Sequence, residues 1–165
     1  MEIFRASDER RTVTTEEVLE AYKDGERDFC RINIVAAKLG GAVLQEIDFS
    51  GSCLRETDFR GANLAGADFR GANLVGARFE GANLAGAKFD GALVSKDTSF
   101  EGANLQGVSI SESNLKEANL KKTVLEWLTL RRDGNEEHDQ ETKDSNLEFS
   151  YLLRKDTDKA KGRVS

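Results

Sequence analysis

The most informative feature of this chain is an apolar side chain that recurs every five residues. Phe, Leu or Ile occupies this position thirteen times in succession, from Phe29 to Phe89. On an α-helix, a step of five residues places successive side chains about 140° apart, so no apolar stripe forms. On a flat strand, an odd step moves each successive side chain to the opposite face. The chain must therefore turn a corner within every repeat, which predicts a solenoid.

Each repeat has five positions with different roles. Residues 62–66 read Ala-Asn-Leu-Ala-Gly, which we interpret as a small inward residue, an outward polar residue, a large inward residue, a second outward residue and a corner. We expect Ala at the first position because nothing larger is predicted to fit there. A long uninterrupted run of such units is a strong repeat signal, whereas a single copy would mean little.

Phe and Leu alternate at the central position from Phe49 to Phe89, which gives a second period of ten. Like residues then stack on like only if four repeats, or twenty residues, complete one coil. The sequence therefore predicts a coil with a square cross-section. The predicted core residues are Phe29, Phe49, Leu54, Phe59, Leu64, Phe69, Leu74, Phe79, Leu84, Phe89, Phe100 and Leu105.

On these repeated units, the sequence resembles the pentapeptide-repeat proteins, whose motif is written A-(D/N)-L-x-x. The resemblance covers residues 28–130. It implies an all-β solenoid, a right-handed quadrilateral β-helix. A short N-terminal helix followed by residues 25–29, Gly-Glu-Arg-Asp-Phe, is similar to the junction of cyanobacterial members.

The spacing of five is interrupted once within the array. Val94 is followed by Phe100 after six residues, so one residue is inserted. We expect Lys96 and Asp97 to form a bulged corner. The spacing of five then resumes, which predicts that Phe79 and Phe100 still lie one above the other.

The N-terminal segment, residues 1–27, is predicted to cap the first coil, because the ends of a solenoid expose core and unpaired backbone. Thr14 and Glu17 form a capping-box pattern, and Gly25 is suited to a left-handed helix end. These signals predict a helix from about residue 15 to residue 24. Its predicted apolar face contains Val18, Leu19 and Tyr22.

The C-terminal end is less regular than the array. The β-helix is predicted over residues 28–130 and is followed by an acidic loop at 131–144. Two further repeats at 145–154 are expected to return and close the end. Residues 155–165 are charged, lack apolar anchors and are predicted to be disordered.

We find no pattern for a catalytic, cofactor or metal site. His138 is the single histidine, and no inward polar residue is predicted, so neither a nucleophilic triad nor a zinc site can be assembled. Residues 133–144 match a calcium loop only in part, because His138 replaces the required Gly and Asp144 the bidentate Glu. Cys30 and Cys53 stand at outward positions and are expected to be free thiols. We therefore predict that the protein is not an enzyme.

Two functions remain. The first is a scaffold that binds an unidentified protein, as the resemblance implies for many cyanobacterial members. The second is a DNA-mimicking modulator of DNA gyrase, which the resemblance implies for other members. The net charge of the whole chain is −6. Residues 28–130 hold 11 Lys and Arg against 13 Asp and Glu, so the net charge of the array is only −2. This nearly neutral array favours the scaffold.

The partner is expected to be a protein, with no small-molecule substrate, nucleic acid or membrane involved. No apolar segment is long enough to span a bilayer, and no secretory signal is visible, so we expect a cytoplasmic monomer. Exposed aromatic and apolar side chains are favoured anchors for a partner. The candidates near the C-terminal end are Trp127, Phe149, Tyr151 and Leu152.

Overall fold

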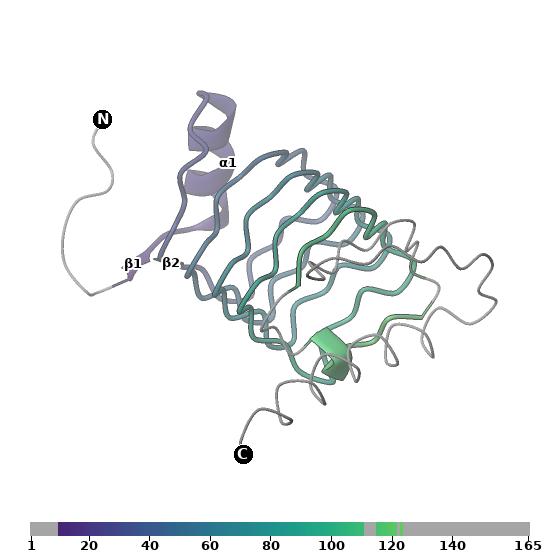
Figure 1. Ribbon diagram of the computed structural model, residues 1–165. Coiled ribbons are helices and arrows are strands. Elements are labelled where there is room, and N and C mark those ends of the chain that lie inside the picture. The colour runs from purple at the N-terminus through teal and green to yellow at the C-terminus, as the bar shows by residue number, and fades with distance from the viewer. Residues whose placement is uncertain (1–9, 111–114, 122, 124–165) are drawn as a thin grey trace, which may run out of the picture.

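The computed structural model describes residues 10–110, 115–121 and 123. Its elements in chain order are β1 (Arg11–Thr12), α1 (Thr15–Lys23), β2 (Ile32–Asn33) and a short 3-10 helix, η1 (Leu115–Glu117). Between β2 and η1 the chain winds into a stack of coils, with α1 at one end (Figure 1). The predicted acidic loop 131–144, closing repeats 145–154 and tail 155–165 lie outside the described residues.

Successive coils pair through single parallel bridges between residues twenty positions apart, as between Asp48 and Asp68. The N–H of Phe69 donates to the carbonyl of Lys88 in the next coil, with an N···O distance of 2.8 Å. Pairing between coils on each face is limited to a single bridge, because a corner residue with positive φ ends the extended segment within each regular five-residue repeat. Gly66, with φ +71°, is one such corner, and glycine adopts this conformation without steric strain. The spacing of twenty agrees with four sides of five residues.

The twelve residues predicted for the core are all buried: Phe29 is 3% exposed and the other eleven are 0% exposed. The rings of Phe59 and Phe79 stack along the coil axis, with centroids 4.9 Å apart and planes at 7°. Across the interior, Phe69 meets Phe79 edge to face at 5.7 Å. Both ring geometries are favourable. Side chains therefore fill the interior of the coil.

The first position of the repeat accepts larger residues than predicted. Ile32, Ile47 and Val108 occupy it and are completely buried, so the expectation that nothing larger than Ala fits is wrong. These residues lie next to small ones in the neighbouring coil. The bridge register places Ile47 next to Ala67 and Ile32 next to Ser52, so large and small side chains share a column.

The absence of inward polar residues was also a wrong prediction. Ser52, Thr57 and Thr98 are buried at the first position. The hydroxyl of Ser52 donates to the carbonyl of Phe29 at 3.0 Å, and that of Thr98 donates to the carbonyl of Leu74 at 2.9 Å. A buried hydroxyl is tolerated when it is hydrogen-bonded in this way. These side chains therefore stabilise the coil and are not free for chemistry.

The insertion predicted at residues 96–97 lies in a turn, as expected. The N–H of Thr98 donates to the carbonyl of Ser95 at 3.0 Å, which closes the corner one residue later than in a regular repeat. The columns continue above it. Phe79 and Phe100 stack with centroids 4.8 Å apart and planes at 2°.

Helix α1 begins with the predicted capping box. The N–H of Thr14 donates to Oε2 of Glu17 at 2.8 Å, and the N–H of Glu17 donates to Oγ1 of Thr14 at 3.2 Å. The helix ends at Lys23, one residue before the predicted end. Gly25 follows with φ +98°, which agrees with the predicted left-handed stop.

The apolar face of α1 differs from the predicted one. Val18 is buried and Tyr22 packs against the core, but Leu19 is 38% exposed, so its assignment to this face was wrong. The buried face is formed by Val18, Ala21 and Tyr22, which lie three and four residues apart and so share one side of a helix. Leu19 lies about 100° away from Val18. The hydroxyl of Tyr22 also donates to the carbonyl of Gln45 at 3.0 Å.

The sequence analysis missed strand β1. It pairs in parallel with β2, with Arg11 opposite Ile32 and Thr12 opposite Asn33. The N–H of Val13 then donates to the carbonyl of Asn33 at 3.1 Å. The N-terminal segment therefore caps the first coil with a strand on one side as well as with a helix over the core.

Candidate interaction surface

The coil presents four outer faces, which we name after the inward residues beneath them. Face A lies over Phe29, Phe49, Phe69 and Phe89; face B over Ile34, Leu54, Leu74 and Val94; face C over Leu39, Phe59, Phe79 and Phe100; face D over Leu44, Leu64, Leu84 and Leu105. Each repeat puts two outward side chains on its face, one before and one after the inward residue. In a square coil, A lies opposite C, and B lies opposite D.

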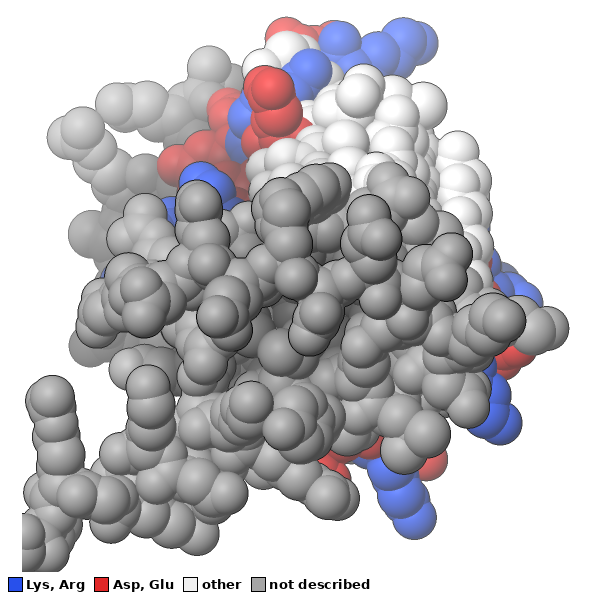
Figure 2. Space-filling model, turned by 45° about the vertical axis from the view of Figure 1, so that its right-hand side comes forward, with Lys and Arg blue, Asp and Glu red and all other residues white. Residues whose placement is uncertain are grey.

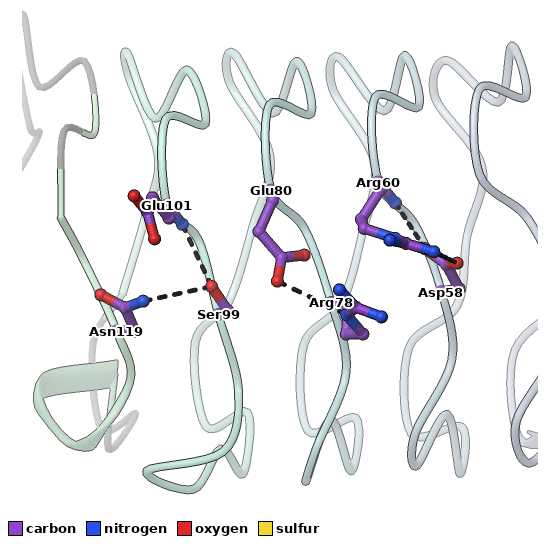
Figure 3. A network of polar contacts seen from close by, with 7 residues as sticks. All are labelled: Asp58, Arg60, Arg78, Glu80, Ser99, Glu101 and Asn119. Atoms are coloured by element: carbon purple, nitrogen blue, oxygen red, sulfur yellow. Dashed lines mark hydrogen bonds and ion pairs between the residues drawn. The ribbon is translucent and has the colours of Figure 1, made fainter.

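Face C carries charges that pair within single coils (Figure 3). Oδ2 of Asp58 lies 2.6 Å from Nη2 of Arg60, and Oε1 of Glu80 lies 3.5 Å from Nε of Arg78. The face also carries a column of alternating charge, because Lys38 bridges to Asp58 and Asp58 to Arg78 in successive coils. The ion pairs, however, join residues two positions apart, which a strand places on the same side.

The hydrogen bonds from Arg60 lower the pKa of Asp58 from its usual 3.8 to about 2. Face A holds a similar pair, in which Oδ2 of Asp68 lies 2.6 Å from Nη2 of Arg70. Burial alone would raise the pKa of Asp68, but the hydrogen bonds and charge of Arg70 lower it. Both carboxylates are therefore ionised and already paired near neutral pH.

Faces B and D are almost free of charge. The outward residues of face D are Val43, Gln45, Asn63, Ala65, Asn83, Ala85, Asn104 and Gln106, and none is charged. Those of face B are Asn33, Val35, Cys53, Arg55, Asn73, Val75, Leu93 and Ser95, with one charge among them. Figure 2 shows such an uncharged side, bordered by charged groups.

Asparagine side chains form an amide ladder on face D. Nδ2 of Asn83 donates to Oδ1 of Asn63 at 3.2 Å, and Nδ2 of Asn104 donates to Oδ1 of Asn83 at 3.3 Å. The same oxygen of Asn83 accepts from the N–H of Ala85. These amides are therefore occupied with one another and with the backbone.

The outward charge follows the alternation of Phe and Leu, a relation that the sequence analysis missed. Repeats centred on Phe read Ala-Asp-Phe-Arg-Gly at 67–71 and Ala-Lys-Phe-Asp-Gly at 87–91. Repeats centred on Leu read Ala-Asn-Leu-x-Gly at 62–66, 72–76 and 82–86. The signal was therefore visible in the sequence. Reading the inward and outward positions together would have found it.

The described residues offer little reactive chemistry. They include no group of three or more His, Cys, Asp or Glu that could hold a metal ion. Cys30 and Cys53 are free and half-buried. Burial and a hydrogen bond with Asp28 raise the pKa of the Cys30 thiol to about 11, so it stays protonated and poorly nucleophilic near neutral pH.

Several predicted positions cannot be placed on these faces. His138 and the four candidate anchors, Trp127, Phe149, Tyr151 and Leu152, lie outside the described residues. Within the described part of the chain, no helix has the length and apolar character needed to cross a membrane.

A comparison with known families matches this chain to the family described as pentapeptide repeats, with eight copies. The matches cover residues 31–66, 62–95 and 97–132, which is more than half of the chain. A search of curated proteins found no match.

Among solved structures, the chain is similar to a pentapeptide repeat protein from the Arabidopsis thaliana thylakoid lumen, with 33% identity and a TM-score of 0.34. That match covers 48% of this chain and 66% of the other. HetL from the cyanobacterium Nostoc sp. strain PCC 7120, described as involved in heterocyst differentiation regulation, is 27% identical with a TM-score of 0.34; the match covers 59% of this chain and 53% of HetL. QnrB1, a plasmid-mediated fluoroquinolone resistance protein, is 19% identical with a TM-score of 0.31. That match covers 79% of this chain and 81% of QnrB1. The first two matches span less than two thirds of those proteins.

Proposed function

Because the chain belongs to the pentapeptide-repeat family, whose repeats build a right-handed β-helix, we propose that it is a non-enzymatic scaffold that binds another protein through its outer surface. The observation that carries this proposal is the filled interior. The rings of Phe59, Phe69 and Phe79 pack against one another with centroids 4.9 to 5.8 Å apart. Since the core is occupied by side chains, recognition belongs to the outer faces.

The division of those faces also supports binding of a protein. Two opposite sides carry paired charges, and the two between them are nearly uncharged. Depletion of charge is typical of the centre of a protein interface, and charged groups are typical of its rim. The partner is a protein in this proposal, and the scaffold itself acts as a cytoplasmic monomer.

A DNA-mimicking modulator of DNA gyrase is the second candidate. A mimic needs rows of acidic groups that stay available to a DNA-binding surface, because phosphate charge dominates the binding that it imitates. Here Asp58 and Asp68 are each paired with an arginine two positions later. These pairs neutralise two of the acids on faces A and C, and residues 28–130 carry a net charge of only −2, so we rank this function below the scaffold.

Capture of a partner tests the scaffold. The full chain, immobilised through a terminal tag, is incubated with native extract, and bound proteins are identified by mass spectrometry. We expect at least one protein that is retained by the folded chain and displaced by free, untagged chain. If every retained protein also binds to beads that carry heat-denatured chain, the proposal is wrong.

A supercoiling assay separates the two candidates. The purified protein is titrated against DNA gyrase with relaxed plasmid as substrate. We expect no change in supercoiling at any concentration at which the protein stays soluble. Inhibition at sub-micromolar concentration, or protection of gyrase from a fluoroquinolone, would favour the DNA-mimicking function over the scaffold function.

A further inference from the structure

Face B differs from the other faces in the state of its arginine. Four arginines stand at outward positions of a face: Arg55, Arg60, Arg70 and Arg78. The last three each form an ion pair with an acid two positions away. Arg55 is exposed and forms no ion pair within the described part of the chain. The cause is local, because the residue two positions before Arg55 is Cys53 and not an acid.

The side chains next to Arg55 in its column are apolar. The N–H of Ala36 donates to the carbonyl of Arg55, and the N–H of Glu56 donates to the carbonyl of Val75, so Val35, Arg55 and Val75 follow one another in successive coils. Coils are about 4.8 Å apart. Arg55 is therefore flanked by Val35 on one side and Val75 on the other, and Val35 is 52% exposed.

The second column of face B contains apolar residues at positions where neighbouring coils have asparagine. Asn33 and Asn73 alternate there with Cys53 and Leu93. At Asn73, Oδ1 accepts a hydrogen bond from the N–H of Val75 at 3.2 Å. A cysteine cannot make this bond well, so Cys53 gives up a local stabilising contact. At Leu93 the corresponding N–H, that of Ser95, donates instead to Oγ1 of Thr98 at 3.0 Å, so an apolar side chain is tolerated there. Leu93 is nevertheless 54% exposed, which the stability of the coil does not explain.

Strand β1 extends face B beyond the first coil. β1 adds Thr12 below Asn33, and Nδ2 of Asn33 donates to Oγ1 of Thr12 at 3.5 Å. The face thus runs from β1 through four coils to Leu93. It presents the exposed side chains of Val35 and Leu93, with one cation between them, Arg55, that forms no ion pair with any described residue.

We propose that face B is the surface that binds the partner, and that the partner contributes a segment with one carboxylate between apolar side chains. This inference rests on the proposed scaffold function. The carboxylate pairs with Arg55, and the apolar side chains contact Val35, Val75 and Leu93. Arginine is a frequent interface anchor, and it pairs with a carboxylate in a bidentate manner. Exposed apolar side chains around it exclude water from the pair.

The test uses a phage-displayed library of random linear peptides as the probe, selected on the full chain. Enriched peptides are synthesised, and their affinities are measured by fluorescence polarisation for the wild type and for three variants. Arg55→Gln removes the cation, and Leu93→Asn restores the residue that the repeat favours. Arg60→Gln is the matched control, because Arg60 holds the same repeat position on face C. Melting temperatures show that each variant is folded.

We expect enriched peptides to contain Asp or Glu next to apolar residues. Arg55→Gln should weaken their binding at least about tenfold, as for loss of a charge-assisted hydrogen bond. Leu93→Asn should also weaken it, whereas Arg60→Gln should not. Binding that survives Arg55→Gln and Leu93→Asn, or enrichment of no peptide, overturns the inference about face B.

The capture experiment separates this failure from failure of the scaffold function. A protein partner retained equally by wild type, Arg55→Gln and Leu93→Asn leaves the scaffold in place and shows that face B is not its binding surface. Absence of any specific partner on the wild type contradicts the scaffold function itself.

Discussion

Faces A and C differ from faces B and D in their outward residues, although all four share one backbone pattern. On face C, Asp58 and Arg60 form an ion pair, whereas on face D Asn63 and Asn83 form an amide ladder. The backbone bonds beneath them are alike: the N–H of Phe59 and the N–H of Leu64 both donate to a carbonyl of the next coil at 2.7 Å. The inward residue and the corner therefore maintain the coil, and the outward positions are free to carry a surface for another purpose.

The largest expected effect tests whether the interior is equivalent on the two kinds of face. Phe69→Ala, under face A, should lower the free energy of unfolding by about 3–5 kcal/mol, and Leu84→Ala, under face D, by about 2–5 kcal/mol. Both side chains are 0% exposed, so both variants leave a cavity. Chemical denaturation measures the change. A near-wild-type midpoint for Leu84→Ala alone would show that only the Phe faces are tightly packed.

A smaller effect is expected for the amide ladder on face D. Asn83→Ala removes hydrogen bonds with Asn63, Asn104 and the N–H of Ala85. It should lower the free energy of unfolding by about 1–2 kcal/mol. Because the lost groups are uncharged, urea denaturation in low and in high salt should give the same difference. A loss that disappears in high salt would contradict this account of face D.

Leu93→Asn on face B should leave the free energy of unfolding nearly unchanged. The N–H of Ser95 already donates to Oγ1 of Thr98, so the new amide replaces no missing backbone bond, and a change within about 0.5 kcal/mol is expected for this exposed position. Thermal unfolding measures this. A clear destabilisation would mean that Leu93 supports the coil, and its exposure would then no longer point to a partner.

The smallest effect concerns the ion pair of face C and appears only in acid. The pKa of Asp58 is about 2 in the folded chain, against an ordinary value of 3.8 that applies to the unfolded chain. The ionised Asp58 therefore contributes its full stabilisation above pH 3.8. This contribution is lost as the pH falls toward 2. The difference in stability between wild type and Asp58→Asn should therefore shrink over that range. The same comparison with Asn83→Ala should show no such change, because Asn83 does not titrate.

Much of the fold could be predicted from the sequence because the signals are local and repeated. The step of five residues excluded helix and flat strand, and the alternation of Phe49 and Leu54 set the number of sides. The capping box of Thr14 and Glu17 needs only three residues of separation, and it is present. The inserted residue before Phe100 could be located because a regular register makes any exception visible.

The candidate site was predicted less well. The sequence analysis chose Trp127, Phe149, Tyr151 and Leu152 for their aromatic and apolar character, and these lie outside the described residues. It did not single out Arg55 or Leu93. Their significance depends on what stands beside them in the next coil, twenty residues away.

The sequence by itself determined the coil, because the inward residue and the corner recur every five residues. Each repeat therefore buries the same kind of side chain and turns at the same position. The twenty-residue stacking was predictable as well, and only the tertiary structure decided the detailed side-chain contacts across coils and at the N-terminal cap. It showed that Ile47 lies next to Ala67, that the hydroxyl of Ser52 donates to the carbonyl of Phe29, and that β1 pairs with β2. It also placed Leu19 toward solvent, because the side of α1 that packs against the core is the one that carries Val18 and Tyr22. Contacts of this kind join residues about twenty positions apart, and no short-range pattern specifies them.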